Sequence, residues 1–368
     1  MAPTSRAGDN ADTVEHLLSR LIDNLVGISD EDDAFLVGTV DGRRYDIKSW
    51  HVWDWTQGVG LYGLIRMHER NGDEAALRHV RDWFAARAGE APPPRTINTM
   101  APLYALAWLA ERDRDPAMLA AIEDWARWTM EELPRTAEQG FQHVVVDLPN
   151  DGQLWDDTLM MTAMPIAKIG RVLGRDDYVE EAVRQFLVHI KYLADRATGL
   201  WFHGWSFVTR DHLSAARWAR GNSWVTMAIP DFLELTGLPR SSGTGAFLIE
   251  TLRAQVAALA LCQREDGLWP TILDDPTSYG EASATAGFAY GILKGVRMGL
   301  LAPDFRAVGL RALDAVTALI DPVTGELGQV SFGTPIFDTI EEYKQVPITA
   351  MPYGQAMAML ALAEGLRA

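Results

Sequence analysis

The stretch "ATAGFAYGILKGV", residues 284–296, is small or apolar on nearly every side of a helix. A helix of this kind has no polar face to turn towards water, so other parts of the protein must surround it. Five further stretches share this character, and they begin near Gln57, Asn98, Asp157, Asn222 and Tyr353. The sequence therefore predicts six buried helices spaced along the whole chain.

Amphipathic stretches alternate with these buried ones, near residues 12–27, 74–87, 116–132, 178–195, 246–263 and 304–319. An amphipathic helix can cover a buried helix while its polar side faces water. Six alternating pairs predict an inner ring wrapped by an outer ring, which is an all-α (α/α)6 barrel. No Ser/Gly-rich linker divides the chain, so we expect a single domain over residues 1–368, with residues 1–11 flexible.

Short β-prone segments follow several of the amphipathic stretches: "GFQHVVVD" at 140–147, "GLWFHGWSF" at 199–207, "GLWPTILDD" at 267–275 and "GELGQVSFG" at 325–333. Each begins with glycine, which indicates a turn followed by a strand. If the connections are uniform, every inner helix enters the ring from the same side. We therefore expect the residues before the inner helices, with these short β segments, to meet at one mouth of the barrel.

The residues before the inner helices are rich in aromatic, histidine and carboxylate side chains. They include Trp50, His51, Trp53, Trp55, Asn98, His143, Trp155, Asp156, Asp157, His203, Trp205, Trp218, Arg220, Asn222, Trp269, Tyr279 and Glu281. Flat rings pack on sugar faces and polar side chains bind hydroxyls, so the set predicts a carbohydrate pocket. Structural roles stay open: core packing for the tryptophans, backbone hydrogen bonds for His143 and His203, and a helix carboxylate as partner of Arg220.

The composition excludes several classes of protein. A formal net charge of −17 without a Lys/Arg cluster argues against nucleic-acid binding. One cysteine, Cys262, allows neither an internal disulfide nor a cysteine-based zinc cluster. No metal-ligand spacing, phosphate loop or nucleophile elbow is present, so we expect no metal and no cofactor. With no secretory signal and no run of ~18 uncharged apolar residues, we expect no membrane span and a cytoplasmic location.

Two adjacent aspartates stand in "GQLWDDTLMM", residues 152–161, just before an inner helix. Asp156 has the position of an N-cap, whose side-chain oxygen accepts from free backbone N–H groups. Asp157 is then the first helical residue, about 100° further round the helix axis. On this interpretation the two carboxyl groups point to different places.

Several of these motifs resemble the unsaturated glycuronyl hydrolases of glycoside hydrolase family 105, whose sister group is family 88. The resemblance rests on "LWDDTLMM" at 154–161, "HGW" at 203–205, "WARGNSW" at 218–224, and "DGLWPTILDDP" through "YGEASATAGFAYG" at 266–291. It implies an (α/α)6 barrel that removes a terminal 4,5-unsaturated uronic acid from lyase-generated oligosaccharides. The family's catalytic Trp-x-Asp carboxylate falls on Asp157.

The resemblance also implies a set of substrate contacts, to which the composition of the mouth adds Trp205. The set is Asn98, His143, His203, Trp205, Trp218, Arg220 and Trp224. Two departures stand out. Related enzymes can carry Asp at position 98, and the family often has a "DG-x-G" stretch where this chain has "TAMPYGQAMAM" at 349–359.

The implied reaction is hydration of an enol ether. A general acid protonates C4 and water adds to C5, so one acid suffices where ordinary glycosidases use a pair of carboxylates. A helix N-terminus lowers the pKa of a carboxyl group, whereas burial beside Trp155 and the charge of a bound uronate raise it. For Asp157 to be the acid, the raising effects must outweigh the helix dipole, and we expect Arg220 to bind the substrate carboxylate or a hydroxyl.

Other functions stay open at this point. The chain also fits another (α/α)6 carbohydrate enzyme, such as a glycosidase acting on saturated sugars or an epimerase, or a non-catalytic carbohydrate-binding toroid. The sequence determines neither the oligomeric state nor the uronate epimer, and it does not identify the sugar beneath the uronate.

Overall fold

The computed structural model describes residues 5–39 and 42–368, with side chains from residue 13 on. Its inner ring consists of α2 (Trp55–Asn71), α4 (Leu103–Asp113), α6 (Met164–Leu173), α8 (Ala219–Thr236), α10 (Ala282–Arg297) and α13 (Pro352–Gly365). Each of these helices packs against the next in that order, and α13 packs back on α2. The ring is therefore closed, and the six predicted buried helices are confirmed.

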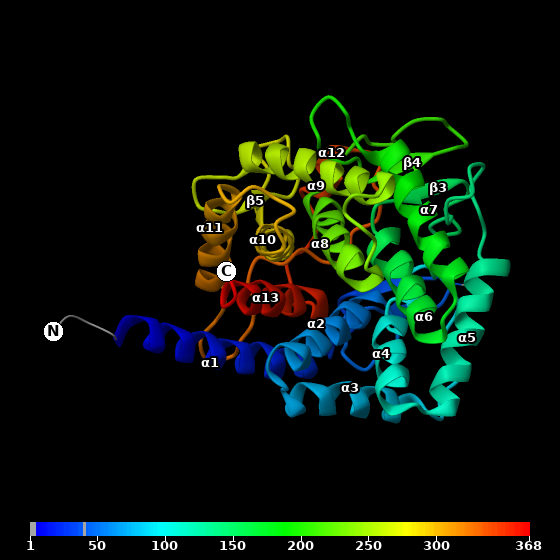
Figure 1. The fold of residues 1–368 in the computed structure, drawn as a ribbon, viewed down its shortest axis with the longest axis horizontal. Helices are drawn as coiled ribbons and strands as arrows, with labels where there is room; N and C mark the ends of the chain where they lie inside the picture. The colour runs from blue at the N-terminus through cyan, green and yellow to red at the C-terminus, as the bar shows by residue number, and fades with distance from the viewer. Residues whose placement is uncertain (1–4, 40–41) are drawn as a thin grey trace.

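The outer ring consists of α1 (Ser5–Gly27), α3 (Glu74–Arg87), α5 (Pro116–Glu131), α7 (Asp176–Leu193), α9 (Gly243–Cys262) and α11 (Phe305–Ala318). Five of them pack on the inner helix that precedes them, and α1 packs on α13, so the two ends of the chain complete one pair (Figure 1). Residues 5–11, which we expected to be flexible, belong to helix α1, and residues 1–4 lie outside the described part.

Polar N-caps and glycine C-caps mark the ends of several helices. At the start of α3 and α5, the carboxylates of Asp73 and Asp115 accept from backbone N–H groups of the first turn. Inner helices α2, α6 and α8 end at glycines in the left-handed conformation, at Gly72, Gly174 and Gly237. Because the connections repeat, the N-termini of the inner helices gather at one end of the ring.

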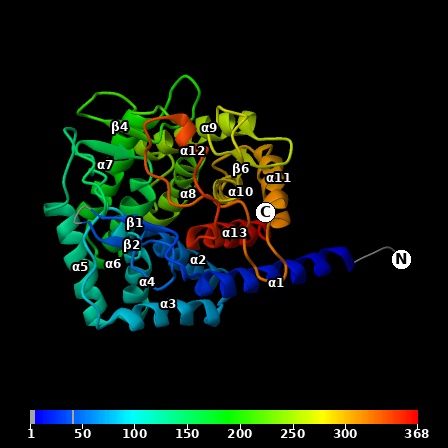
Figure 2. The same ribbon diagram turned by 180° about the vertical axis from the view of Figure 1, so that it is seen from behind.

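Three short two-stranded antiparallel sheets lie at that end: β1 (Leu36–Gly38) with β2 (Arg44–Asp46), β3 (Gln153–Trp155) with β4 (Gly204–Ser206), and β5 (Trp269–Pro270) with β6 (Gly280–Glu281). Figure 2 shows β1, β2 and the short helix α12 (Ile340–Tyr343) on the near side of the barrel. The predicted segments at 199–207 and 267–275 contain β4 and β5. Those at 140–147 and 325–333 make only isolated bridges, such as Arg135 with Phe141 and Ser331 with Ile348.

Two inner helices begin with an irregular turn. A 3-10 turn, η1 (Asn98–Met100), precedes α4, and a π-helix, η2 (Leu159–Ala163), precedes α6. π-Helical turns occur frequently at functional sites, because the wider turn changes the direction in which side chains leave the helix. The π-helix starts two residues after Asp157.

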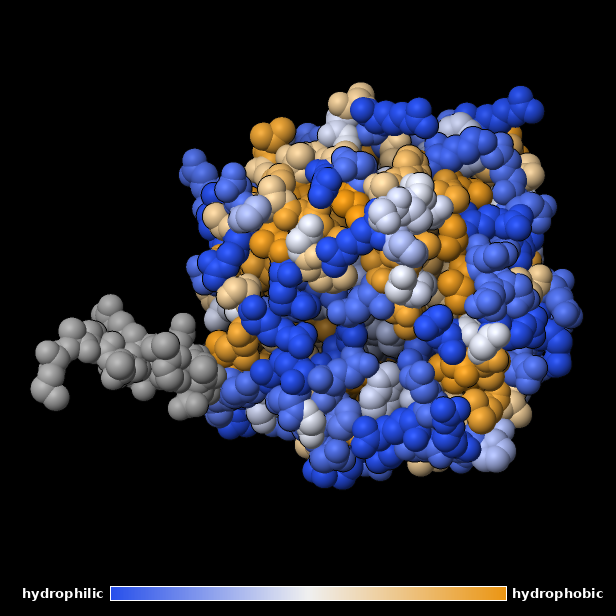
Figure 3. Space-filling model, viewed as in Figure 1, coloured by the Kyte–Doolittle hydropathy of each residue, from blue (hydrophilic) through white to orange (hydrophobic). Residues whose placement is uncertain are grey.

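Helix α9 is long and apolar enough to cross a membrane by length and composition alone. It packs on α8 and α11 as a wall of the barrel, and its surface carries an ion pair between Arg253 and Glu250. The exposed side chains of Phe247 and Leu261 also belong to this helix. In Figure 3, hydrophobic residues appear in separate patches among hydrophilic ones.

Candidate active site

A cavity of about 130 Å³ opens at the mouth of the barrel. It is lined by Val37, Ile47, Asp54, Trp55, Asn98, His143, Val145, Val146, Asp147, Leu148, Trp155, Asp157, Trp218, Gly333, Thr334 and Pro335. The predicted catalytic Asp157 and three of the predicted substrate contacts, Asn98, His143 and Trp218, are therefore brought together. His203, Trp205, Arg220 and Trp224 are not among the lining residues.

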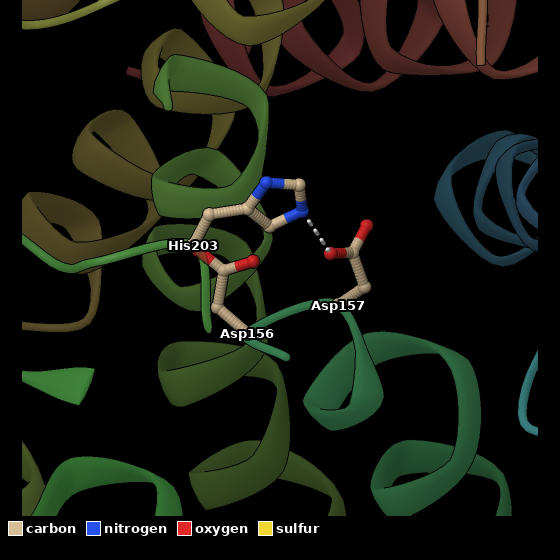
Figure 4. A group of neighbouring side chains, drawn as sticks. All are labelled: Asp156, Asp157 and His203. Atoms are coloured by element: carbon tan, nitrogen blue, oxygen red, sulfur yellow. Dashed lines mark ion pairs between the residues drawn. The ribbon is translucent and has the colours of Figure 1, made fainter. Parts of the chain in front are cut away.

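The two-stranded sheet of β3 and β4 positions the aspartate pair. Trp155 pairs with Gly204, and the N–H of Asp156 donates to the carbonyl of His203 at 3.0 Å. The strand ends there, and the chain turns through Asp157 into the π-helix. The His203 side chain thus lies beside the pair, with its Nε2 3.3 Å from Oδ2 of Asp157 (Figure 4).

His203 connects the pair to a distant part of the chain. Its Nδ1 lies 2.8 Å from the hydroxyl of Tyr343, which helix α12 brings to the mouth. Burial lowers the pKa of His203, although Asp157 acts in the opposite direction, so the ring is neutral near pH 7. When the Tyr343 hydroxyl donates to Nδ1, the proton of the neutral ring sits on Nε2 and faces Asp157.

His143 forms a wall of the cavity. Its ring stacks on Trp155, with centroids 4.3 Å apart and an angle of 6° between the planes. Its Nδ1 lies 2.8 Å from the hydroxyl of Thr158. Burial lowers the pKa of His143 to about 3, so this ring is also neutral. The side chains of both His143 and His203 therefore bind other side chains, which differs from the backbone-bonded alternative for them.

The two aspartates differ in their affinity for protons. Burial alone would raise the pKa of Asp157, but the polar contact with His203 at 3.3 Å, with further help from His143, lowers it to about 2. Burial raises the pKa of Asp156 well above its usual range, and the charge of Asp157 raises it further. Near neutral pH, Asp156 therefore carries a proton and Asp157 is ionised in the ligand-free protein.

The expectation that Asp156 caps a helix is wrong. Neither of its carboxyl oxygens has a hydrogen-bond partner, and the side chain is 0% exposed. It packs on Gly221 of α8, where an added Cβ would lie 2.3 Å from Oδ2 of Asp156. The reason is that Asp156 directly follows strand β3, where its N–H still bonds to His203, and its side chain points to α8 rather than along a helix.

The expected divergence of the two carboxyl groups is also wrong. One ligand atom from each of Asp156, Asp157 and His203 lies within 4.8 Å of the others. The 100° rotation applies only along a regular helix, and here the chain turns between a strand and a π-helix. Three donors form an incomplete set for zinc or magnesium, and two of them already face each other as an ion pair. We therefore interpret the group as one that handles protons.

Arg220 is fully buried and holds a loop. One of its terminal nitrogens donates to the carbonyl and hydroxyl of Ser331, and the other to the carbonyl of Phe332 and the hydroxyl of Thr334. Glu281, which caps α10, lies 3.8 Å away. Glu281 therefore agrees with the structural alternative for Arg220, in which a carboxylate of a helix is its partner. A direct bond from Arg220 to the substrate stays a prediction, and these contacts favour an indirect role.

Two predicted contacts lie away from the cavity. Trp205 pairs with Leu154 on β3, and its ring packs against Tyr192 and His212, with centroids 5.3 and 4.8 Å away. Trp224 is fully buried within α8 and meets the ring of Trp55 edge-on at 6.2 Å. Their contacts with substrate stay predictions that these positions do not favour.

Sequence reasoning missed Asp54 and Tyr343. The Oδ1 of Asp54 accepts from the N–H of Trp55 at 2.6 Å, while its Oδ2 is buried without a partner. Burial raises the pKa of Asp54 to about 7. The sequence did contain a signal for Asp54. A Trp-Asp pair stands before an inner helix at Trp53-Asp54, as it does at Trp155-Asp156. Tyr343 offers no such signal, because only the fold brings it to His203.

The closed ring of six helix pairs and the acidic, aromatic-walled cavity at one mouth define the class of protein: an (α/α)6 enzyme acting on carbohydrate. The sequence model of Glycosyl Hydrolase Family 88 matches residues 28–368. The chain belongs to this family and is a glycoside hydrolase.

Comparison with individual proteins supports the same family. The chain is 35% identical over 322 residues to the unsaturated rhamnogalacturonyl hydrolase YesR of Bacillus subtilis, a match that covers 86% of this chain and 90% of that protein. The crystal structure of a possible member of the GH105 family from Salmonella enterica is 50% identical, with a TM-score of 0.95 and coverage of 97% of this chain and 94% of that one. A similar Klebsiella pneumoniae structure is 48% identical, with a TM-score of 0.93, and covers 100% of this chain and 95% of that one. The predicted resemblance is confirmed.

Proposed function

We propose that this enzyme removes a terminal 4,5-unsaturated uronic acid from short oligosaccharides, with Asp157 as the proton donor. One observation carries the proposal: in a chain of this family, Asp157 lies in the cavity with one oxygen held by His203. Because Oδ2 is shut off from solvent, Oδ1 is the oxygen that a ligand can reach. The Bacillus subtilis relative is named for unsaturated rhamnogalacturonyl substrates, which supports a pectin-derived disaccharide as the substrate class.

The chemistry balances with one acid and one water molecule. Asp157 gives a proton to C4, and the positive charge that develops at C5 is shared with the ring oxygen. Water adds to C5 and returns a proton to the enzyme. The hemiketal opens, and the glycosidic C–O bond then breaks to release the shortened oligosaccharide. No covalent sugar–enzyme intermediate is needed, so a carboxylate nucleophile at retaining distance is not required.

The cavity suits a flat, unsaturated ring. The rings of Trp155 and Trp218 form walls, and Val145, Val146 and Leu148 supply an apolar border that excludes water from the reacting carbon. A volume of about 130 Å³ leaves room for about one sugar ring. The enzyme is therefore proposed to act at chain ends.

The charge of the cavity gives the reaction a pH dependence. No lysine or arginine lines the cavity in the described residues, while Asp54, Asp147 and Asp157 do. Burial raises the pKa of Asp54 to about 7 and raises that of Asp147 as well, so both are less charged in mild acid. An anionic substrate then meets less repulsion, and kcat/KM is expected to fall as the pH rises above about 7.

The test is a substrate panel followed by ultraviolet absorbance, because hydration destroys the C4=C5 chromophore. Unsaturated disaccharides from pectin, glycosaminoglycan, ulvan and arabinogalactan-type polymers are compared with their saturated counterparts. Loss of absorbance, fastest with the unsaturated galacturonyl-rhamnose disaccharide, is the expected result. Cleavage of saturated sugars alone would favour an ordinary glycosidase, and binding without turnover would favour a carbohydrate-binding toroid.

We also propose that the enzyme works in the cytoplasm on imported oligosaccharides. A small cavity that accepts chain ends supports this, as does the unpaired thiol of Cys262, which suits a reducing compartment. Fractionation of producing cells, with activity measured in each fraction, is the test. Activity in the culture medium would contradict the proposal.

A further inference from the structure

Asp156 is a buried acid that the reaction above does not use. It is sealed behind Asp157, does not line the cavity, and has no partner for either oxygen. An acid in such a place is costly unless it stays neutral, so this side chain carries a proton. It also restricts its neighbour, because any residue larger than glycine at position 221 would collide with its carboxyl group.

The proposed reaction raises a question about protons. Asp157 must deliver a proton to C4, yet its contact with His203 favours the ionised form before substrate arrives. The proton must therefore reach Asp157 from a neighbouring group.

The histidines are poor sources. If neutral His203 gave up its Nε2 proton, the proton of Tyr343 would have to move to Nδ1 to replace it, leaving a buried tyrosinate. Burial raises the pKa of Tyr343, which opposes that charge. His143 is neutral as well, and its Nδ1 is engaged with Thr158. Asp156 is the remaining neighbour that holds a proton it can release.

We propose that Asp156 and Asp157 share a single proton, which rests on Asp156 in the free enzyme and passes to Asp157 when an anionic substrate fills the cavity. Asp156 is a positioning residue in this scheme, since it acts only through Asp157. The inference rests on the proposed function, which requires an acid at Asp157.

The geometry gives the substrate a way to move the proton. Asp157 lines the cavity and Asp156 does not, so the substrate's carboxylate is closer to Asp157 and raises its proton affinity more. Two carboxyl groups this close cannot both ionise readily, so the pair keeps one proton while its location changes. The two carboxyl groups approach within 4.8 Å, so a side-chain rotation that brings them into contact lets the proton pass directly and without solvent.

Helix α8 stabilises Asp156 once it becomes charged. Gly221, on which the carboxyl group packs, is the third residue of this helix of 18 residues. The positive end of the helix dipole therefore faces the carboxylate. Arg220, one residue earlier on α8, carries a charge that acts on His203 and is itself compensated by Glu281 at 3.8 Å. The titratable groups around the pair are thus His203 on the β4 side, with Arg220 beyond it, Tyr343 on α12 and His143 in its loop.

The proton balance closes over one turnover. The shared proton leaves Asp157 for C4, and both carboxyl groups are ionised at that moment. The water that adds to C5 then loses a proton to the pair. Once the anionic product leaves, the contact with His203 again favours ionised Asp157, and the proton rests on Asp156. The pair is therefore restored without another cofactor or co-reactant.

The test is Asp156→Asn, because an amide has the shape of the protonated acid but cannot give up its proton in this way. We expect KM to stay within a few-fold of the wild-type value and kcat at pH 7 to fall by about 100-fold. Activity is expected to recover in acid, so the alkaline limb of the kcat profile shifts to lower pH. The exposed Asp314 on α11 provides the control variant, Asp314→Asn, which should keep the wild-type profile.

A wild-type kcat and an unshifted alkaline limb in Asp156→Asn would overturn the inference. A wild-type enzyme that leaves every unsaturated disaccharide intact would instead overturn the proposed function. The two failures are therefore distinguishable.

An infrared measurement keeps the inference falsifiable if Asp156→Asn does not fold. At about pH 8.5, above the pKa of Asp54, the wild-type enzyme should still show the C=O band of a buried carboxylic acid. That band should shift in frequency when a saturated uronate disaccharide fills the cavity. Absence of the band, or a band whose frequency does not change when the disaccharide binds, would overturn the inference.

Discussion

The two ends of the inner ring both bury acids, but they treat them differently. At the C-terminal end, Asp231 accepts hydrogen bonds from Tyr62, Tyr290 at 2.9 Å, Arg66 at 3.1 Å and Lys294. Burial alone would raise the pKa of Asp231, but Lys294 and Arg66 lower it, so this carboxylate is permanently charged.

At the N-terminal end of the ring, the acids lack a full set of polar partners. Asp156 has no partner for either oxygen, and the only ionic partner of Asp157 among the described residues is a neutral histidine. A carboxyl group with a full set of partners keeps one charge state, whereas one with open positions can change its state when a ligand arrives. The comparison teaches that partners, rather than burial, distinguish the structural acid from the acid that does chemistry.

Size does not identify the site, because a cavity of about 530 Å³ between α7 and α9 is larger than the cavity at either end of the ring. The cavity beside Asp231 measures about 360 Å³, against about 130 Å³ at the mouth. Its wall carries cations and acids in nearly equal number, and Arg66 and Lys294 are already paired with Asp231 and Glu234. The cavity beside Asp231 is therefore interpreted as a polar end of the barrel, and the one at the mouth as the site.

A large loss of stability is expected at the C-terminal end of the ring, where the buried acid has a full set of partners. Asp231→Asn leaves Lys294 and Arg66 with reduced compensation in a buried place, which should cost about 3 kcal/mol of unfolding free energy. The kcat of the folded fraction should not change. Urea unfolding and absorbance assays on the same preparation measure both quantities. A large loss of kcat with unchanged stability would remove the distinction between the two ends.

Asp54 is an intermediate case, with one partnered and one open oxygen. Its pKa is about 7 in the folded protein and about 4 in the unfolded chain, so the fold binds more protons between these values. Stability is therefore lost as the pH rises from about 4 to about 7, by at most about 4 kcal/mol.

Asp54→Asn keeps the acceptor for the N–H of Trp55 but does not titrate. The variant should therefore gain stability relative to the wild type as the pH rises through this window. Thermal unfolding of both proteins across the pH range measures the difference. A constant difference would show that Asp54 does not hold a proton in the fold.

A smaller effect is expected at Arg220, whose two terminal nitrogens hold the 331–334 loop beside the cavity. Arg220→Lys keeps the charge but loses part of the fork of hydrogen bonds, which should cost about 2 kcal/mol of stability. Because the loop places Thr334 in the cavity wall, KM should rise while kcat changes less. A loss confined to kcat would instead indicate that Arg220 contacts the reacting sugar.

The fold was predictable because its signal is local. The residues of each helix alone show whether it is apolar all round or amphipathic. The six predicted pairs therefore match the observed ones to within a few residues, apart from the early start of α1. The position of Asp157 in the cavity followed from a short motif before an inner helix.

The details of the site were not predictable, since they depend on contacts between distant residues. Arg220 binds a loop 111 residues later, and His203 binds Tyr343 at a separation of 140 residues. The geometry of Asp156 and Asp157 was misjudged for a different reason. A regular helix was assumed where the chain leaves a strand and enters a π-helix, and in that turn adjacent side chains converge.

The most direct test of the central claim is the kcat of Asp157→Asn with an unsaturated galacturonyl disaccharide, followed by loss of absorbance. The account predicts a fall of at least about 100-fold in kcat, with the Kd for the disaccharide and the unfolding temperature nearly unchanged. Asp314→Asn serves as the matched control. A kcat for Asp157→Asn close to the wild-type value would contradict the account.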